Sequence, residues 1–210
     1  MMRMTMGTDL FGGEGGGGSP IPTSTPIPSK RPKGVVFFAV RPDVEANAAA
    51  TTVLDSLQAQ HGLTEAGLAP DSRHVTLFPI GHAEDLTPAA IDVVRRVAAA
   101  QEMKSFDATF DRAMSFNTKQ PKQPLVLVGS DGNEKTMLFR RAFLADMKRV
   151  GLHFKGMSGF TPHMTLLYSA RTITEQPVKP IRWTVREFVL IHSHYGYGRH
   201  EILGRWQLED

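Results

Sequence analysis

Two short segments carry the residues best suited to chemistry. The first is His74-Val75-Thr76-Leu77, and the second is His163-Met164-Thr165-Leu166. Side chains on a strand alternate between its two faces, so each histidine shares a face with the threonine two positions later. The apolar residues of each segment then point into the packed core. Two such strands supply two imidazoles and two hydroxyls around one groove.

This set of groups suits the hydrolysis of a phosphodiester. A neutral imidazole can take a proton from water, and a protonated one can give a proton to the leaving oxygen. The unperturbed histidine pKa of roughly 6.5 makes both states available near neutral pH. Each transfer is typically worth on the order of 10² to 10⁴ in rate. We therefore predict His74 and His163 as catalytic residues, with Thr76 and Thr165 donating hydrogen bonds to phosphate oxygens.

A single His-x-Thr on a strand is most often incidental, so the prediction depends on the duplication. Phe37 precedes His74, and Val126 precedes His163, by the same 37 positions. Each segment is reached through a strand, a helix and a second strand. Two such repeats packed about a pseudo-twofold axis would bring the two segments face to face.

The hydrophobic pattern predicts an α/β or α+β domain with mixed sheets. We expect residues 1–34 to form a disordered Gly-, Pro- and Ser-rich tail, and residues 35–210 to form one domain, with repeats of about 35–122 and 123–210. The expected strands are 35–40, 73–80, 105–116, 125–128, 163–168, 181–194 and 200–208, and the expected helices are 43–60, 87–103 and 134–150. The last two strands form a terminal hairpin with Gly196 and Gly198 in its turn.

Charge and composition narrow the class of function. The net charge is +3, and residues 1–34 carry +2 of it, so the folded part is nearly neutral. That balance argues against a broad basic surface for long duplex nucleic acid. No apolar run is long enough to span a membrane, so we expect no membrane partner. The absence of cysteine excludes a thiol nucleophile and Cys-ligated metals, and it fits a reducing, cytoplasmic location.

A zinc site is not expected. His192 and His194 share a strand face, but zinc needs three or four ligands and the sequence places no convincing third ligand beside them. The expectation is therefore no metal and no cofactor. His61, His82, His153 and His200 have no motif context, and Arg140-Arg141 is interpreted as a solvated helix face.

The motifs resemble those of the 2H phosphoesterase superfamily, named for two H-x-T/S-x signatures. Within it the chain is similar to the bacterial RNA 2′,3′-cyclic phosphodiesterases, historically called 2′-5′ RNA ligases. The resemblance covers about residues 34–208. The additional similar segments are Val36–Val40 with Arg41-Pro42, Pro124–Gly129, Phe160-Thr161-Pro162, Glu187–Leu190 and Trp206-Gln207-Leu208.

The resemblance implies a bilobal α+β fold in which two antiparallel sheets line a central cleft, with helices on the outside. It implies metal-independent opening of a 2′,3′-cyclic phosphate at an RNA end to a 2′-phosphate, with His74 as general acid and His163 as general base. A 2′-5′ RNA ligase activity is associated with the family. The partners would be single-stranded RNA ends or small cyclic phosphate nucleotides, bound by a monomer.

Two groups after the second motif complete the predicted site. Tyr168 and Arg171 are predicted substrate contacts, although some relatives place a basic residue nearer to the motif. Phe78 and Phe116 are expected in the core rather than stacked on a base. Two alternatives stay open: a related enzyme acting on 2′-5′ oligonucleotides or small cyclic nucleotides, and a module that binds RNA ends without turnover.

Overall fold

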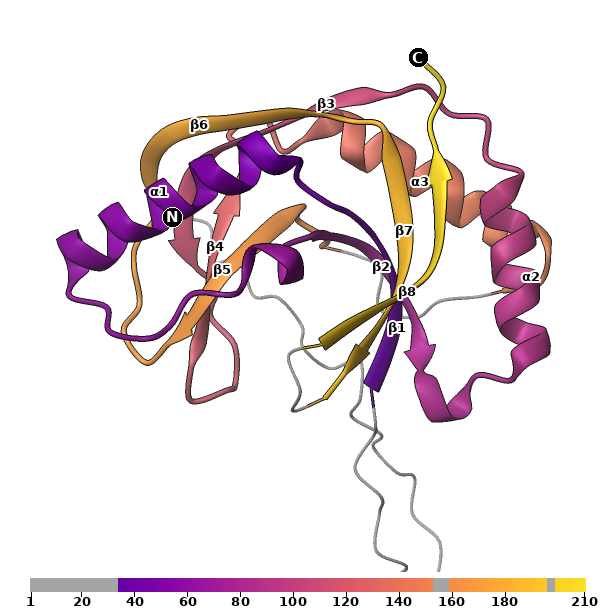
Figure 1. Ribbon diagram of the computed structural model, residues 1–210, viewed down its shortest axis with the longest axis horizontal. Helices are drawn as coiled ribbons and strands as arrows, with labels where there is room; N and C mark the ends of the chain where they lie inside the picture. The colour runs from indigo at the N-terminus through magenta and orange to yellow at the C-terminus, as the bar shows by residue number, and fades with distance from the viewer. Residues whose placement is uncertain (1–33, 153–158, 196–198) are drawn as a thin grey trace, which may run out of the picture.

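The computed structural model describes residues 34–152, 159–195 and 199–210. Within them, eight strands accompany three α-helices and two short 3₁₀ turns (Figure 1). The strands are β1 Gly34–Val40, β2 Val75–His82, β3 Phe106–Ser115, β4 Gln123–Val128, β5 His163–Ser169, β6 Gln176–Val185, β7 Glu187–His194 and β8 Arg199–Gln207. The helices are α1 Val44–His61, α2 Pro88–Ala99 and α3 Glu134–Arg149, and the 3₁₀ turns are Pro70–Ser72 and Ala83–Asp85.

The strands form one antiparallel sheet in the order β6-β3-β4-β5-β2-β1-β7-β8. The order is symmetric about its centre, where β5 and β2 meet through a single residue pair, Val75 with Met164. The predicted α+β class is confirmed. Two separate sheets were expected, but the two four-stranded halves are joined because the strands that carry the two motifs lie edge to edge.

The two halves of the sheet draw on both halves of the chain. Strand β3 pairs with β4 and β6, whereas β7 pairs with β1 and β8. Each half therefore combines one strand–helix–strand unit with two further strands, β3 and β6 in one half and β7 and β8 in the other. The halves of the sheet do not follow a division of the chain near residue 122.

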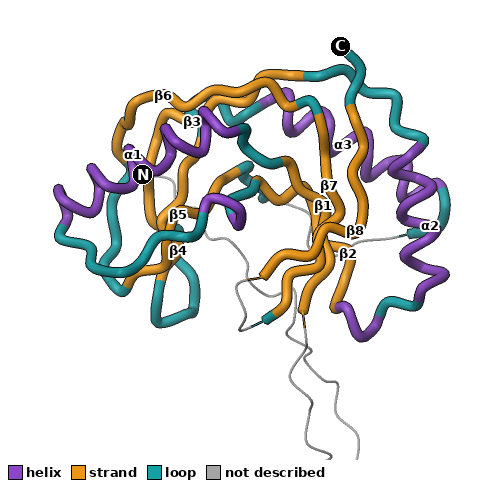
Figure 2. Tube along the Cα trace, in the orientation of Figure 1, coloured by secondary structure: helices purple, strands orange, loops and turns teal. Residues whose placement is uncertain are grey.

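The helices cover one face of this sheet. The main core combines residues of all three helices with strand residues such as Phe38 and Leu190. In Figure 2, α1 lies along β6 at the left of the molecule and α2 lies beside β8 at the right. Two small clusters contain strand and loop residues but no helix residue. One consists of Phe37, Ala39, Val189 and Ile191, and the other of Phe116, Val126 and Val128. These clusters lie on the other face of the sheet. Because no helix residue belongs to them, that face has room for a groove.

The helix starts follow the expected local chemistry. Asp43 caps α1 by accepting a hydrogen bond from the backbone N–H of Ala46 at 2.7 Å. Thr87 caps α2 through Ala90 N–H at 3.2 Å, and Pro88 is the first helical residue. These caps satisfy N–H groups that have no partner within the helix. Among the described residues, no helix combines the length and apolarity needed to cross a bilayer.

The expected strand 181–194 is wrong as a single element. It is interrupted at Arg186, so that β6 and β7 lie in opposite halves of the sheet. The start of β6 was missed because it contains Pro177 and Pro180, which argue against a central strand. Proline is tolerated on an edge strand, and β6 is at the edge of the sheet. Gly196 and Gly198, expected in the terminal turn, lie outside the described residues.

Each motif strand contains a bulge directly after its threonine. In β2 the register passes from Thr76 to Phe78, and in β5 it passes from Thr165 to Leu167. Two consecutive residues are therefore buried, Leu77 with Phe78 and Leu166 with Leu167. A bulge leaves one residue out of the ladder and changes which face the following side chains occupy.

The bulged carbonyl groups find partners outside the sheet. The oxygen of Leu77 accepts a hydrogen bond from Arg140 Nε on α3 at 2.8 Å, and that of Leu166 accepts one from the N–H of Leu68 at 2.7 Å. The Arg140 side chain is buried and lies 4.2 Å from the centre of the Phe160 ring. The expectation of a solvated face is therefore wrong for Arg140 but holds for the exposed Arg141.

We predict that Arg140→Met destabilises the fold by about 2 to 4 kcal/mol, because it removes a buried charge-assisted hydrogen bond and leaves the Leu77 carbonyl unsatisfied. Urea unfolding followed by circular dichroism measures the change. Arg141→Met is the matched control and should shift the free energy of unfolding by less than about 0.5 kcal/mol. Equal effects of the two substitutions would contradict this account.

Candidate active site

The two motif histidines are held in the same way. His74 Nδ1 lies 2.8 Å from the backbone oxygen of Ser72, and His163 Nδ1 lies 2.8 Å from that of Thr161. A carbonyl oxygen only accepts, so each Nδ1 carries the proton and donates it. Each ring is therefore fixed in the tautomer that leaves Nε2 with a lone pair. That nitrogen can accept a proton from water or, once protonated, donate one.

The pairing of β2 with β5 sets the arrangement of the four motif side chains. Val75 is paired with Met164, so continuing the antiparallel register places His74 across from Thr165 and His163 across from Thr76. Val75 and Met164 are buried, whereas the four polar residues are half-buried on the other face. The structure thus brings together the four residues that the spacing predicted.

Each imidazole rests against a phenylalanine. The ring centres of Phe37 and His74 are 4.9 Å apart, and those of Phe116 and His163 are 4.8 Å apart. Phe37 and Phe116 belong to the two small clusters on the groove face. Both are buried, which agrees with a packing role for Phe116, and Phe78 is fully buried in the main core. The pseudo-twofold relation therefore extends to the apolar support of each histidine.

Burial controls the protonation of both groups. Desolvation lowers the pKa of His74 to about 4, against the opposing effect of the Ser72 carbonyl, and the charges of His200, His163 and Arg41 lower it further. Desolvation also lowers the pKa of His163, although the Thr161 carbonyl works in the other direction. Both imidazoles are neutral at pH 7 before an anion binds.

A groove of about 590 Å³ opens beside His163. Thr165 and Tyr168 line it from β5, and Lys122 contributes a cationic side chain from the loop before β4. Tyr168 faces the same groove as Thr165, although three positions separate them, because the bulge at Leu166 shifts the alternation. A side-chain hydrogen bond links Tyr168 to Thr165, and partial burial raises the pKa of the phenol. Tyr168 is therefore a neutral hydrogen-bond donor at pH 7.

Arg171 does not join this groove in the described contacts. Its guanidinium donates to the backbone oxygen of His61 at 3.3 Å and lies near Gly62, at the end of α1. Arg73, directly before the first motif, is buried and donates to Asn47 O and Thr51 Oγ1. Arg73 therefore ties β2 to α1.

Two groups beside His74 were not predicted. The rings of His200 and His74 lie 5.1 Å apart at a steep angle, and Arg41 lies close enough to lower the pKa of both histidines. Arg41 Nη2 donates to the backbone oxygen of Asp71 at 2.7 Å. Arg41 had a sequence signal, since it follows the first strand as in the family. His200 had none, because it reaches the site from β8 through the strand pairing.

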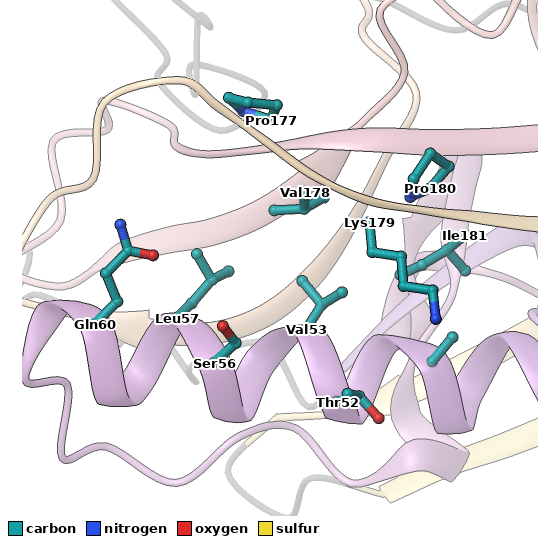
Figure 3. A pocket seen from close by; sticks show the side chains of 11 residues that line it. Thr52, Val53, Ser56, Leu57, Gln60, Pro177, Val178, Lys179, Pro180 and Ile181 are labelled. Carbon is teal, nitrogen blue, oxygen red and sulfur yellow. The ribbon is translucent and has the colours of Figure 1, made fainter.

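Another hollow, of about 360 Å³, lies between α1 and β6. Figure 3 shows its lining of aliphatic and proline side chains, with Thr52, Ser56, Gln60 and Lys179 among them. Its described lining contains no histidine or carboxylate, so it offers no acid and base pair. We interpret it as the seam where α1 packs on the edge strand.

Several solved structures share this fold. Escherichia coli LigT in complex with 3′-AMP is 23% identical, with a TM-score of 0.68 over 84% of this chain and 99% of that one. LigT in complex with NADP⁺ is also 23% identical, with a TM-score of 0.67 over 85% and 99%. The protein TT0787 of Thermus thermophilus is 18% identical, with a TM-score of 0.62 over 83% and 97%. No curated protein sequence matches the chain.

The sequence profile of the 2′-5′ RNA ligase superfamily matches residues 42–196, which is most of the chain. The match begins just after β1 and includes both His-x-Thr-Leu segments, together with the helix that precedes each of them. Together with the shared architecture, it identifies the chain as a member of the 2′-5′ RNA ligase superfamily, the 2H phosphoesterases.

Proposed function

We propose that the protein opens 2′,3′-cyclic phosphates at RNA ends to 2′-phosphates without a metal ion. One observation carries the proposal: two histidines on neighbouring strands, each with Nδ1 tied to a carbonyl two residues earlier, present their Nε2 atoms to one face. A phosphodiester held between them has a base on one side and an acid on the other.

In the proposed reaction, His163 Nε2 takes a proton from water, and the resulting hydroxide attacks phosphorus. The bond from phosphorus to the 3′ oxygen breaks, and protonated His74 Nε2 gives its proton to that oxygen. The product is a 2′-phosphate with a free 3′ hydroxyl. The burial that lowers the pKa of His74 also makes it a strong acid once the anionic phosphate has drawn a proton onto it.

The surrounding groups fit the charge on phosphorus. Thr76 and Thr165 lie across the two strands from the imidazoles and donate to non-bridging oxygens, as the spacing predicts. Arg41 supplies a positive charge beside His74, and Lys122 supplies one beside His163. We propose Tyr168 as a further donor, whereas Arg171 would first have to leave the end of α1.

Relatives support a nucleotide ligand. LigT structures contain 3′-AMP, NADP⁺ or ATP, and each of these carries a phosphate on a ribose. A 2′-5′ oligonucleotide and a small cyclic nucleotide also carry a phosphodiester on a ribose. Assays on these two ligands beside an RNA 2′,3′-cyclic phosphate end separate the three substrates. Tight binding of a cyclic-phosphate end with no product would instead indicate a binding module.

We predict that His74→Ala and His163→Ala each lower kcat on an RNA 2′,3′-cyclic phosphate by about 10² to 10⁴, because each removes one proton transfer. The assay is run in EDTA, and the product is identified as a 2′- or 3′-phosphate. His61→Asn, at the end of α1, is the control and should keep full activity. Unimpaired turnover in both alanine variants would overturn the mechanism.

Removing the hydroxyl of Thr76 or Thr165 should affect the transition state more than binding. We predict that Thr76→Val or Thr165→Val lowers kcat by about 10 to 10³, with a smaller change in KM, since hydrogen bonds to the phosphate strengthen as charge develops. Each change keeps the shape and β-branch of the side chain. A loss confined to KM would assign these hydroxyls to uniform substrate binding.

The lowered histidine pKa values set the pH dependence. The competent free protein carries one protonated and one neutral imidazole, and lowering both pKa values moves this form to lower pH. We predict that kcat/KM reaches its maximum below about pH 6.5, the ordinary histidine value. It should fall as the pH rises beyond it. A maximum at pH 7.5 or above would show that the rings are not desolvated in solution.

A further inference from the structure

We propose that His192, His194 and Glu201 form a binding site for a divalent transition-metal ion, with Zn²⁺ as the best-suited ion. Their ligand atoms all lie within 4.8 Å of one another. The sequence argument against zinc was the lack of a third ligand beside the two histidines. The structure supplies that ligand from β8, the partner strand of β7.

The site lies on the opposite face of the sheet from the catalytic groove. On β7, Val189 and Ile191 belong to the groove-face cluster, whereas Phe188 and Leu190 belong to the main core. Strand alternation therefore places His192 and His194 on the core side, and their ring centres lie 3.9 Å apart. The proposed metal is separate from the proton-transfer site.

The ladder aligns the carboxylate with the histidines. Glu201 is the direct partner of His192 in the β7–β8 register. On the same strand, its neighbour His200 is turned the other way, toward Phe37 and His74. Alternation on β8 thus places His200 on the groove face and Glu201 on the opposite face, beside the two imidazoles.

The separations suit a small tetrahedral ion. Glu201 Oε2 lies 3.1 Å from His194 Nε2 and 3.7 Å from His192 Nδ1. Ligands about 2.0 to 2.1 Å from a tetrahedral Zn²⁺ are separated from each other by roughly 3.3 Å. Small side-chain rotations close the set around one ion. Three protein ligands leave a fourth position for water.

The three side chains are accessible to solvent, and the His192 ring makes few competing interactions. Within the described part of the chain, the His192 ring makes no hydrogen bond, since its Nε2 is buried without a partner and its Nδ1 is 3.7 Å from the carboxylate. The exposed fractions of the His192, His194 and Glu201 side chains are 18%, 30% and 52%, so an ion can enter from solvent.

Nearby charge also favours a cation. Glu84, in the 3₁₀ turn Ala83–Asp85, acts electrostatically on His192 in the same sense as Glu201. The carboxylate of Glu84 therefore adds negative charge near the site, beside that of Glu201. A bound ion would clamp β7 to β8 near the end of β7, within the same strand pair that carries His200 to the groove.

The test is a titration of the full, metal-stripped protein with Zn²⁺ against a chromophoric chelator. We expect one equivalent to bind, and we expect His194→Asn or Glu201→Gln to weaken binding by at least about 100-fold, since loss of a direct ligand exceeds the usual effect of a surrounding residue. Zn²⁺ should raise the Tm of the wild type and leave that of both variants unchanged.

Two controls separate this site from other zinc-binding groups. Glu187 is on β7, like the two histidines, but its carboxylate pairs with Arg205. Glu187→Gln should therefore leave zinc affinity unaltered. The double variant His74→Asn, His163→Asn should also bind Zn²⁺ as the wild type does. Circular dichroism of each metal-free variant checks that it is folded. Zinc binding abolished by that double variant but untouched by Glu201→Gln, or no stoichiometric binding at all, overturns the proposal.

Discussion

The arrangement of the candidate site depends on one contact, the pairing of Val75 with Met164 where β2 meets β5. It is the single ladder position that joins the two halves of the sheet in the described residues, and the motif histidines flank it in sequence. A shift of one residue would exchange the faces of the two strands and bury the imidazoles while exposing apolar side chains. The apolar residues of each motif therefore fix the register, and the register places the polar ones. The geometry of the candidate site is therefore a consequence of core packing.

Desolvation sets the protonation of the two motif histidines, whose positions the strand register fixes. Each histidine is pressed against a phenylalanine from a small groove-face cluster, and each compensates by donating Nδ1–H to a nearby carbonyl. The hydrogen bond orients the ring, and the burial keeps it neutral. A buried imidazole would otherwise leave a polar group unsatisfied, which costs about 1 to 3 kcal/mol. The two interactions together give a site whose protonation responds to an arriving anion.

Local pattern predicted the elements that depend on neighbouring residues. The alternation in both motifs and the matching repeats could be deduced from the sequence, and the expected helices 43–60 and 87–103 begin at the residues that cap α1 and α2. Non-local pairing could not. The prolines of β6 disguised an edge strand, and the bulge at Leu166 turns Tyr168 into the groove. His200 and Glu201 carry no local signal, because their roles follow from the register of β8 against β7.

Histidines on the two faces of this sheet have different kinds of neighbouring residues. In the described part of the chain, the group able to converge on a metal is His192, His194 and Glu201. The motif pair faces threonines, aromatic rings and cationic groups instead. Burial, and then the charges of His200 and Arg41, lower the pKa of His74. A carboxylate beside an imidazole stabilises the protonated ring or a bound metal ion. A neighbouring cation and apolar surroundings disfavour both. The groove is thus suited to an anion, and the opposite face is suited to a cation. Adjacent positions of β8 contribute to each, so strand alternation alone keeps the two chemistries apart.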